Sequence, residues 1–232
     1  MKLSLVITNY NRTALLHESF RNVLNDDRID EIVIVDDHSD YFTRNWIEDK
    51  FKNYSKVNIY LNPVNIGQQR IKGNAVGRAK NEWVILFDSD NIIKSDYIDA
   101  LFKHVPKFQD NCIYMPQAAN PQFDFRKFAG LYYHKQQVAQ NITDGMFNIC
   151  MNTANYVVNR DFFLKTFKRN EDMKGADVVW HSIQHMEAGG IFFIVPEMEY
   201  YHRVHKGSGF MKDMDYNMKK AAELREIIKA YR

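Results

Sequence analysis

The chain has 232 residues, of which 45% are hydrophobic and 26% charged, a composition typical of a globular protein with one large domain. Its 31 Lys and Arg residues nearly balance 29 Asp and Glu residues, so the formal net charge of +2 gives no argument for a nucleic-acid partner. The two cysteines, Cys112 and Cys150, lack metal-ligand spacing, and no apolar window reaches the length of a signal peptide or a membrane span. We therefore expect a cytoplasmic protein without structural zinc, with peripheral contact to a membrane left open.

Strand and helix patterns alternate through the first 105 residues. The stretch "LSLVIT" is predicted to be a strand, and Thr13 is predicted to cap a helix that runs to about Leu24. "EIVIVDDHSD" is a second apolar strand that ends in acidic residues, "RNWIEDKFKNY" a helix, and "KVNIYLN" a third strand stopped at Pro63. "NIGQQRIKGNAVGRAK" is expected to be a loop that enters a helix. This βαβαβαβ order predicts a parallel, doubly wound sheet.

The regular alternation of strands and helices ends after Pro106. We expect a short strand at "CIYMPQ", a strand and a helix in "NYVVNRDFFLKTF", a helix from Asp177 to about Ala188, and a buried strand at "IFFIVP". "EYYHRVHKGSGF" is predicted to form a glycine-containing loop before a last helix. One apolar stripe of that helix favours packing on its own domain, with a dimer or membrane contact as the alternative. The stripe consists of Met214, Met218, Ala221, Leu224, Ile228 and Tyr231.

Two aspartates follow the most apolar run of the chain. The segment from Trp83 to Phe87 is predicted to be a strand buried on both faces, and Asp88 and Asp90 lie directly after it. Ligands bind at the carboxyl ends of strands in open α/β sheets. Two carboxylates one residue apart can reach a divalent cation or the phosphates that it carries, whereas a solvated turn is the alternative.

The order of "SLVITNYNR", "IVIVDDHSD", "NIGQQRIKGNAVGRAKNEWVILFDSDN" and "GADVVW" resembles the nucleotide-sugar glycosyltransferases with the GT-A fold, in particular the inverting family 2. The resemblance covers nearly the whole chain. It implies one α/β, Rossmann-like domain over residues 1–232, with a mixed, mostly parallel sheet flanked by helices. Residues 1–105 would form the nucleotide-binding half, and residues 106–232 the acceptor-binding half with the C-terminal helix.

The same resemblance implies an activity and its partners. The enzyme would move a sugar, with inversion, from a UDP-linked donor to a hydroxyl of a glycan, lipid-linked or protein acceptor. Mn²⁺ or Mg²⁺ would neutralise the leaving diphosphate as a Lewis acid. No nucleic-acid partner or transmembrane segment is expected, and an oligomer could form through the C-terminal helix.

The donor-binding residues follow from the family's pattern. An aspartate can accept the ring N–H of uracil, and backbone groups at the end of the first strand can satisfy a base edge. By resemblance, the base and ribose would contact Thr8, Asn9, Tyr10, Asp36 and Asp37. The metal and diphosphate would contact Asp88, Ser89 and Asp90, with Asp90 as the direct ligand and Asp88 on the ribose, the sugar or a metal-bound water.

The helix before the two aspartates departs from the family's pattern. Lys72 and Gly73 stand where the family usually has Arg-Asn, and Arg70 lies two positions before Lys72. Either cation can contact uracil or phosphate, or lie on a solvated helix face. We favour Lys72 because it keeps the family's register.

The candidate catalytic base is Asp177 in "KGADVVWHS", where the family carries a Glu-Asp pair. Ala176 replaces the usual acidic neighbour. Inverting transfer needs one carboxylate on the acceptor side to take the hydroxyl proton, whereas a helix cap is the alternative role for Asp177. Trp180, one turn later, would stack on a sugar face or belong to the core.

The late segment "YYHRVHKGSGF" resembles a family loop that completes the metal site and closes over the donor. Both histidines, His202 and His205, are candidate metal ligands, and we favour His205. Arg203 and Lys206 would add positive charge at the diphosphate. Gly207 and Gly209 would act as hinges of the closing segment.

Three other protein classes remain open. Haloacid-dehalogenase phosphatases also place two such aspartates after a strand, with Asp88 as nucleophile, but their motif continues with Thr or Val and not with Asn91. Nucleotidyltransferases usually carry a glycine-rich basic loop after the first strand, and "TNYNRTALL" has no glycine. A nucleotide-sugar-binding module without catalysis is the third.

Overall fold

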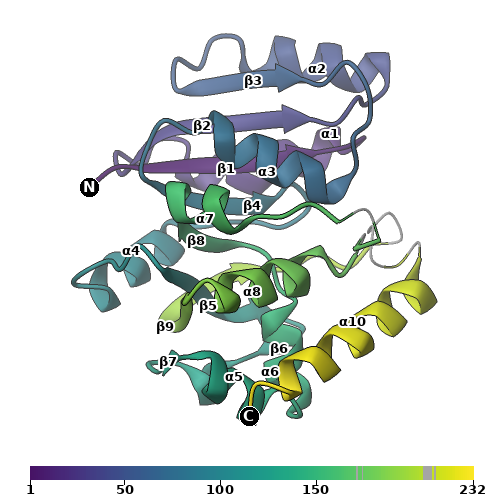
Figure 1. Cartoon of the computed structure of the whole chain (residues 1–232). Coiled ribbons are helices and arrows are strands. Elements are labelled where there is room, and N and C mark those ends of the chain that lie inside the picture. Colours follow the sequence, from purple (N-terminus) through teal and green to yellow (C-terminus); the bar gives the residue numbers. More distant parts are fainter. Residues whose placement is uncertain (171, 174, 206–210, 212) are drawn as a thin grey trace.

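The computed structural model describes all residues except 171, 174, 206–210 and 212. They form one mixed sheet with helices on both faces (Figure 1). The strand order is β3-β2-β1-β4-β8-β5-β9-β7, and β6 pairs with β5 outside this path. No helix among the described residues is long and apolar enough to span a membrane.

The first four strands form the predicted parallel part of the sheet. They are β1 (Leu3–Asn9), β2 (Ile29–Asp36), β3 (Val57–Leu61) and β4 (Trp83–Asp88), all pairing in parallel. β1 and β4 are buried along nearly their whole length, as their apolar runs require, whereas the edge strand β3 is half-buried. The connections are α1 (Thr13–Phe20) with the 3₁₀ turn η1 (Arg21–Val23), α2 (Tyr41–Phe51) and α3 (Gln68–Arg78).

The second half continues the same sheet in mixed directions. β8 (Tyr156–Asn159) lies antiparallel between β4 and β5 (Cys112–Asn120), and β5 pairs in parallel with β9 (Ile191–Tyr201). The two-residue strands β6 (Phe123–Asp124) and β7 (Tyr132–Tyr133) extend it. The helical segments are α4 (Ser95–His104), η2 (Arg126–Phe128), α5 (Lys135–Asn141), α6 (Gly145–Met151), α7 (Arg160–Thr166), α8 (Asp177–Glu187) and α10 (Met214–Lys229).

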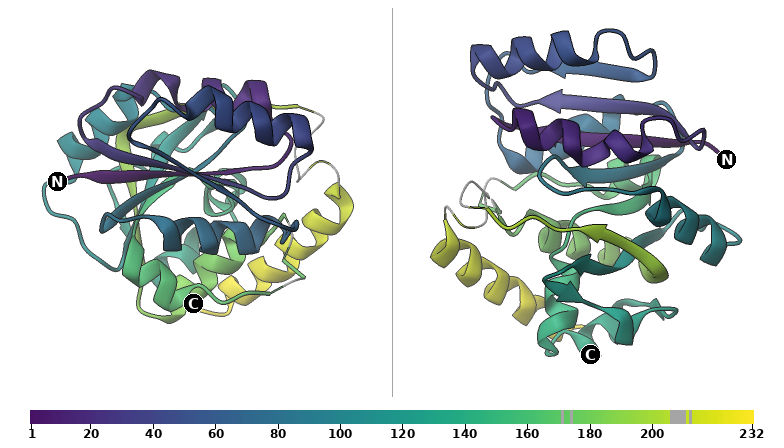
Figure 2. Two further views of the ribbon diagram at one scale, coloured as in Figure 1. Left: turned by 90° about the horizontal axis from the view of Figure 1, so that it is seen from above. Right: turned by 180° about the vertical axis from the view of Figure 1, so that it is seen from behind.

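The helices form two layers (Figure 2). α1, α2 and α4 lie on one face of the sheet, and α3, α7, α8 and α10 lie on the other. Because α3 belongs to the first half and α7 and α8 to the second, this second layer brings the two halves together beside the central strands. The candidate base at the start of α8 therefore lies in the same layer as the candidate cations of α3.

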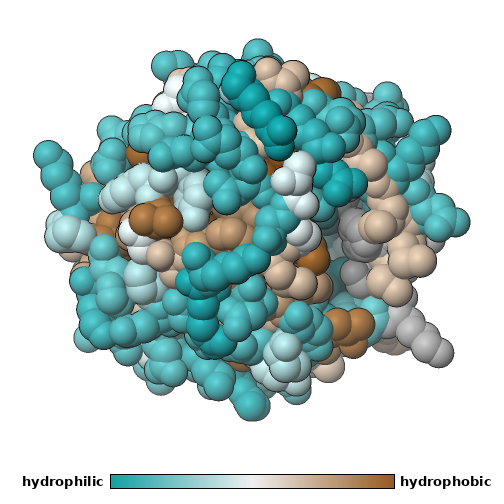
Figure 3. Space-filling view, turned by 90° about the horizontal axis from the view of Figure 1, so that it is seen from below, coloured by the Kyte–Doolittle hydropathy of each residue, from teal (hydrophilic) through white to brown (hydrophobic). Residues whose placement is uncertain are grey.

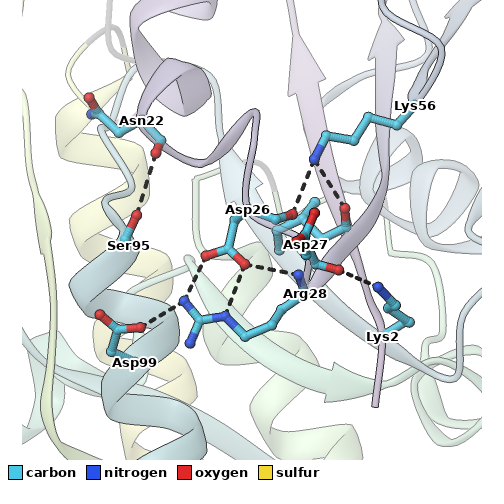
Figure 4. A network of polar contacts seen from close by, with 9 residues as sticks. Lys2, Asn22, Asp26, Asp27, Arg28, Lys56, Ser95 and Asp99 are labelled. Atoms are coloured by element: carbon cyan, nitrogen blue, oxygen red, sulfur yellow. Dashed lines mark hydrogen bonds and ion pairs between the residues drawn. The ribbon is translucent and has the colours of Figure 1, made fainter.

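Polar contacts also join segments at the opposite, amino edge of the sheet (Figure 4). The guanidinium of Arg28 lies 2.7 Å from carboxylate oxygens of both Asp26 and Asp99, and the Lys56 ammonium donates to the backbone carbonyls of Asp26 and Ile29. These bonds fix the turn before β2 against α4.

The C-terminal helix packs on its own domain, but through only part of the predicted stripe. Leu224 and Ile228 are buried, and α10 contacts α5 and α8. Met214 and Met218 are exposed, so their assignment to the packed stripe was wrong. Figure 3, which looks onto the molecule from below the view of Figure 1, shows hydrophobic residues in separate patches among hydrophilic ones. A dimer through this helix stays a prediction.

Two other details of the sequence prediction were wrong. Thr13 is the first helical residue of α1 and not its cap; Arg12 occupies that position without a side-chain cap, and the α-helix ends at Phe20. β9 continues beyond "IFFIVP" into the first three residues of the segment expected to be a loop and ends at Tyr201. A register shift opposite Pro116, with Glu197 at a φ of 62°, lets this strand stay paired with β5.

Candidate active site

Parallel pairing brings three predicted site segments to one edge of the sheet. β1 pairs with β2 so that Asn9 lies opposite Asp36, and with β4 so that Thr8 lies opposite Asp88. The carboxyl ends of these strands therefore lie side by side, the usual place for a ligand in such a sheet.

Asp36 is fully buried and fixes the turns around it. One carboxylate oxygen accepts bonds from the amide of Asn9 and the hydroxyl of Ser39, and the other accepts the backbone N–H of Ser39. The carboxylate has these partners without any ligand. Its predicted contact with a base stays a prediction, whereas its positioning of Ser39 is direct.

Asp37 holds the loop that leads into α3. Its carboxylate accepts the amide of Asn62 at 3.0 Å and the backbone N–H groups of Ile66 and Gly67, both at 2.9 Å. Gly67 has a φ of 86°, a conformation that glycine adopts without strain. The carboxylate thus organises the entry to the helix that carries Arg70 and Lys72.

The turn after β1 carries an aromatic residue and a cation on either side of Asn11. Asn11 has a φ of 53°; its backbone N–H donates to the Ser39 hydroxyl at 2.7 Å, and its side-chain oxygen accepts the N–H of Asp40. On either side lie Tyr10, which is 46% exposed, and the partly buried Arg12. The sequence analysis missed Asn11, Ser39 and Arg12, although a cation directly after the strand-end turn was a usable signal.

The turn after β4 places its two aspartates in different surroundings. Asn155, from the loop before β8, accepts the backbone N–H of Asp88 at 2.8 Å. Burial raises the pKa of Asp88, and the neighbouring Lys72 opposes that shift. Ser89 is fully buried, and its hydroxyl has no hydrogen-bond partner among the described residues.

The carboxylate of Asp90 meets a cation and an imidazole. Its Oδ2 atom lies 2.9 Å from Nη1 of Arg12 and 3.0 Å from Nε2 of His205. His202 instead packs against Phe123, with ring centroids 5.3 Å apart and an interplanar angle of 55°. Of the two candidate histidines, the one favoured from sequence is therefore the one in contact with Asp90.

Arg203 contacts the protein and not an open site. Its guanidinium donates to the backbone carbonyl of Asp90, to that of Leu15 at 2.9 Å and to the Glu18 carboxylate at 2.7 Å. These bonds tie the turn after β4 to α1, so any contact with a diphosphate stays a prediction. Lys206, Gly207 and Gly209 lie outside the described residues. Arg70 is partly buried in the first turn of α3.

A buried ion pair joins the two halves of the chain. Nζ of Lys72 lies 2.7 Å from Oδ2 of Asp177, and the two side chains are 4% and 3% exposed. The predicted phosphate-binding cation and the predicted base are thus direct partners. Burial alone would lower the pKa of Lys72, but the carboxylates of Asp177, Asp88 and Asp90 outweigh it and raise that pKa.

The residue after Lys72 explains how α3 comes close to the end of α7. A Cβ atom at Gly73 would lie 2.7 Å from the ring of Phe167, just after α7. The absence of a side chain therefore lets α3 approach the segment that leads to Asp177. This close approach gives a physical reason for glycine where the family usually has asparagine.

The rest of α8 faces the core. Trp180 is partly buried, and its indole N–H donates to the carbonyl of Lys168 at 3.0 Å, which favours the packing role over sugar stacking. His181 and His185, at successive turns after Asp177, are buried. Burial lowers the pKa of both, for His185 to about 4.

The candidate metal-ligating side chains suit an ion that arrives with a phosphate ligand. Among the described residues, no group of three or more His, Cys, Asp or Glu side chains could hold an ion. Asp90 and His205 supply one carboxylate and one imidazole in direct contact. Mg²⁺ commonly uses one or two carboxylates and completes its shell with water and substrate phosphates. Asp90 and His205 therefore suit an ion that takes its other ligands from water and substrate phosphates, and not an ion held by protein side chains alone.

Comparison with known proteins gives matches in sequence and in fold. The model of the family described as Glycosyl transferase family 2 matches residues 4–171. A GalNAc(5)-diNAcBac-PP-undecaprenol beta-1,3-glucosyltransferase of Campylobacter jejuni is 28% identical over 104 residues, which are 44% of this chain and 34% of that protein. The chain thus spans about a third of the length of this curated relative.

Solved structures of S. aureus TarS have a similar fold. TarS 1-349 in complex with UDP-GlcNAc matches 98% of this chain and 66% of its own, with a TM-score of 0.71 and 15% identity. The structure of TarS 1-349 described without a ligand matches 100% of this chain and 70% of its own, with a TM-score of 0.67 and 15% identity. At this identity the likeness shows the fold, which is the α/β arrangement expected from the sequence.

Proposed function

Because the chain belongs to glycosyl transferase family 2 and is thereby an enzyme of the glycosyltransferase type, we propose that it moves a sugar from a nucleoside diphosphate to a hydroxyl acceptor with inversion. The observation that carries this proposal is the cluster around Lys72. Two carboxylates at the end of β4 and one at the start of α8 all act on this buried ammonium. In this proposal Asp88 and Asp90 act on the donor and Asp177 acts on the acceptor, and Lys72 lies between them.

The donor is a uridine nucleotide sugar bound across the carboxyl ends of β1, β2 and β4. The exposed ring of Tyr10 stacks on the base, while Thr8 and Asn9 face its edge and Asp36 and Asp37 hold the surrounding turns. The UDP-GlcNAc named in the TarS structure supports this nucleotide. The sugar itself is not selected by these contacts.

Asp90 and His205 would hold a divalent cation, Mn²⁺ or Mg²⁺, that arrives with the donor. When bound, the ion supplies Lewis-acid neutralisation of the diphosphate. Asp88 faces the ribose or the sugar, and the neighbouring Lys72 limits the negative charge that the three aspartates present to an anionic donor.

Asp177 takes the proton of the acceptor hydroxyl. Lys72 donates to its Oδ2 atom, which fixes the orientation of the carboxylate for this role. The acceptor oxygen attacks the anomeric carbon as the bond to the diphosphate breaks on the opposite side, so the configuration inverts. In this chain Ala176 stands where an acidic neighbour was expected, and the side chain that contacts the proposed base is the cation Lys72.

A lipid-linked acceptor has support from the Campylobacter relative, whose name specifies an undecaprenol-linked substrate. Such an acceptor would bring the protein to the cytoplasmic surface of a membrane. Glycans and proteins remain the alternative acceptors, and each is tested by supplying it with the same donor.

The direct test is incubation with UDP-, GDP- and dTDP-sugars, Mn²⁺ and each acceptor class, followed by analysis of the products. We expect nucleoside diphosphate and a glycosylated acceptor as products, with the largest amount of both formed from a UDP-sugar. Inorganic phosphate would indicate a phosphatase, and release of pyrophosphate from a nucleoside triphosphate and a sugar phosphate would indicate a nucleotidyltransferase. Binding of the donor without turnover of any acceptor would indicate a binding module.

A further inference from the structure

Arg12 occupies the carboxylate oxygen that a metal ion would need. Its Nη1 atom lies 2.9 Å from Asp90 Oδ2, the same atom that His205 approaches to 3.0 Å. The side chains of Arg12 and Asp90 are 22% and 13% exposed, so this pair is better shielded from water than a typical surface pair. Arg12 has no role in the assignments that the sequence pattern suggested.

The position of Arg12 is fixed by the backbone, although its side chain is long. The Ser39 hydroxyl donates a hydrogen bond to Asp36 and accepts one from the backbone N–H of Asn11. Asn11, directly before Arg12, has the positive φ of 53° that this turn requires. The guanidinium therefore starts from an anchored Cα atom at the edge where β1 and β4 end. Arg203, the other described arginine beside Asp90, is bound to carbonyl groups and to Glu18.

We propose that Arg12 is an exchangeable counter-ion, which neutralises Asp90 before the donor binds and transfers to the diphosphate when a divalent cation takes Asp90. The proposal rests on the function proposed above. An arginine and a divalent cation cannot both approach one carboxylate oxygen closely, because their charges repel. The diphosphate that accompanies the ion offers the planar guanidinium two oxygens, which suits its fork of donors.

This exchange couples the two ligands. An ion that binds alone must displace Arg12 from Asp90 and leave it without a partner, which weakens binding of the free ion. An ion that binds with UDP displaces Arg12 onto the diphosphate, so each ligand strengthens the binding of the other. Linkage requires the same factor in both directions. Without Arg12, the ion should bind better alone and the coupling should decrease.

The test is calorimetry of Mn²⁺ alone, UDP alone and UDP with saturating Mn²⁺, for the wild type, Arg12→Gln and Arg12→Lys. In Arg12→Gln we expect tighter binding of Mn²⁺ alone, and a loss of about tenfold or more in UDP affinity with Mn²⁺, the size of a lost charged hydrogen bond. Arg12→Lys should retain part of the coupling. The matched control is Arg21→Gln, which changes an exposed arginine at the other end of α1. This variant should bind both ligands as the wild type does.

Unchanged affinities and unchanged coupling in Arg12→Gln would overturn the exchange, as would a UDP loss that is equally large without Mn²⁺. A loss of thermal stability alone would assign Arg12 a structural role and also overturn it. A wild type that binds no UDP with or without Mn²⁺ would instead contradict the proposed function, and the exchange would fall with it. The two failures are therefore distinguishable.

Discussion

The ammonium of Lys72 donates a hydrogen bond to the carboxylate of Asp177 at 2.7 Å, and both side chains are almost completely buried. These residues lie 105 positions apart, on α3 and α8, so the bond joins the first half of the chain to the second. It combines a structural role with a proposed catalytic one, and the two roles can be separated by experiment.

Replacing Lys72 by Met should destabilise the protein by about 3–5 kcal/mol, because Asp177 would keep a buried charge without its partner. The measurement is the free energy of unfolding in urea. Lys80→Met is the matched control, since Lys80 and Asp30 form an exposed pair at 3.2 Å that should contribute little to stability. Equal stabilities of the two variants would show that the buried pair is not important for the fold.

Two glycines of α3 should respond in opposite ways to alanine. Gly73→Ala should destabilise the protein by about 1–3 kcal/mol, because its Cβ would overlap the Phe167 ring. Gly77→Ala meets only Leu164, at 4.0 Å, and should stabilise the helix by roughly 0.5–1 kcal/mol. Thermal unfolding of both variants tests this difference, and stabilisation by both would mean that α3 does not need its close approach.

Stability should fall as the pH falls below 6.5. Burial lowers the pKa of His185 to about 4, so between pH 6.5 and 4 the unfolded chain binds a proton that the folded chain does not. The free energy of unfolding should then decrease by up to about 1.4 kcal/mol per pH unit for this residue, and His181 acts in the same direction. His185→Gln should reduce the slope measured between pH 6 and 4.5 by about one proton. An unchanged slope would contradict a neutral, buried His185.

Tyr10→Ala should weaken uridine and UDP alike, by about tenfold or more, if its exposed ring stacks on the base. Tyr10→Phe should bind both ligands normally because stacking needs only the ring. Tyr54, which is 37% exposed at the amino edge of the sheet, supplies the control variant Tyr54→Ala. Calorimetry that finds the same affinity in Tyr10→Ala as in this control would remove Tyr10 from the base site.

The parallel half of the fold was predictable because its signals are local. Buried apolar runs end at Asp36 and Asp88, and their alternation with helices predicts parallel strands joined by crossovers, whereas the strand order comes from the structure. The mixed half was harder, since the antiparallel placement of β8 and the length of β9 depend on pairing with distant strands. The hydrophobic periodicity of a segment does not predict which strand it will pair with.

The candidate site shows the same division. Residues directly after strands, such as Asp90 and Tyr10, could be singled out from their positions. The pairing of Lys72 with Asp177 could not, because it depends on the approach of α3 that Gly73 permits. Arg12 was overlooked for a related reason: a cation at the start of a helix is common, and only its distance to Asp90 distinguishes it.

The central claim is that Asp177 deprotonates the acceptor while Lys72 holds it in place. The most direct test is the initial rate of sugar transfer by Asp177→Asn, measured with the donor affinity at a temperature where the variant is folded. We predict a rate lower by about 10²- to 10⁴-fold, with UDP-sugar affinity nearly unchanged and with inverted configuration in the wild-type product. Transfer by Asp177→Asn at close to the wild-type rate, or a product that keeps the donor's configuration, would contradict the account.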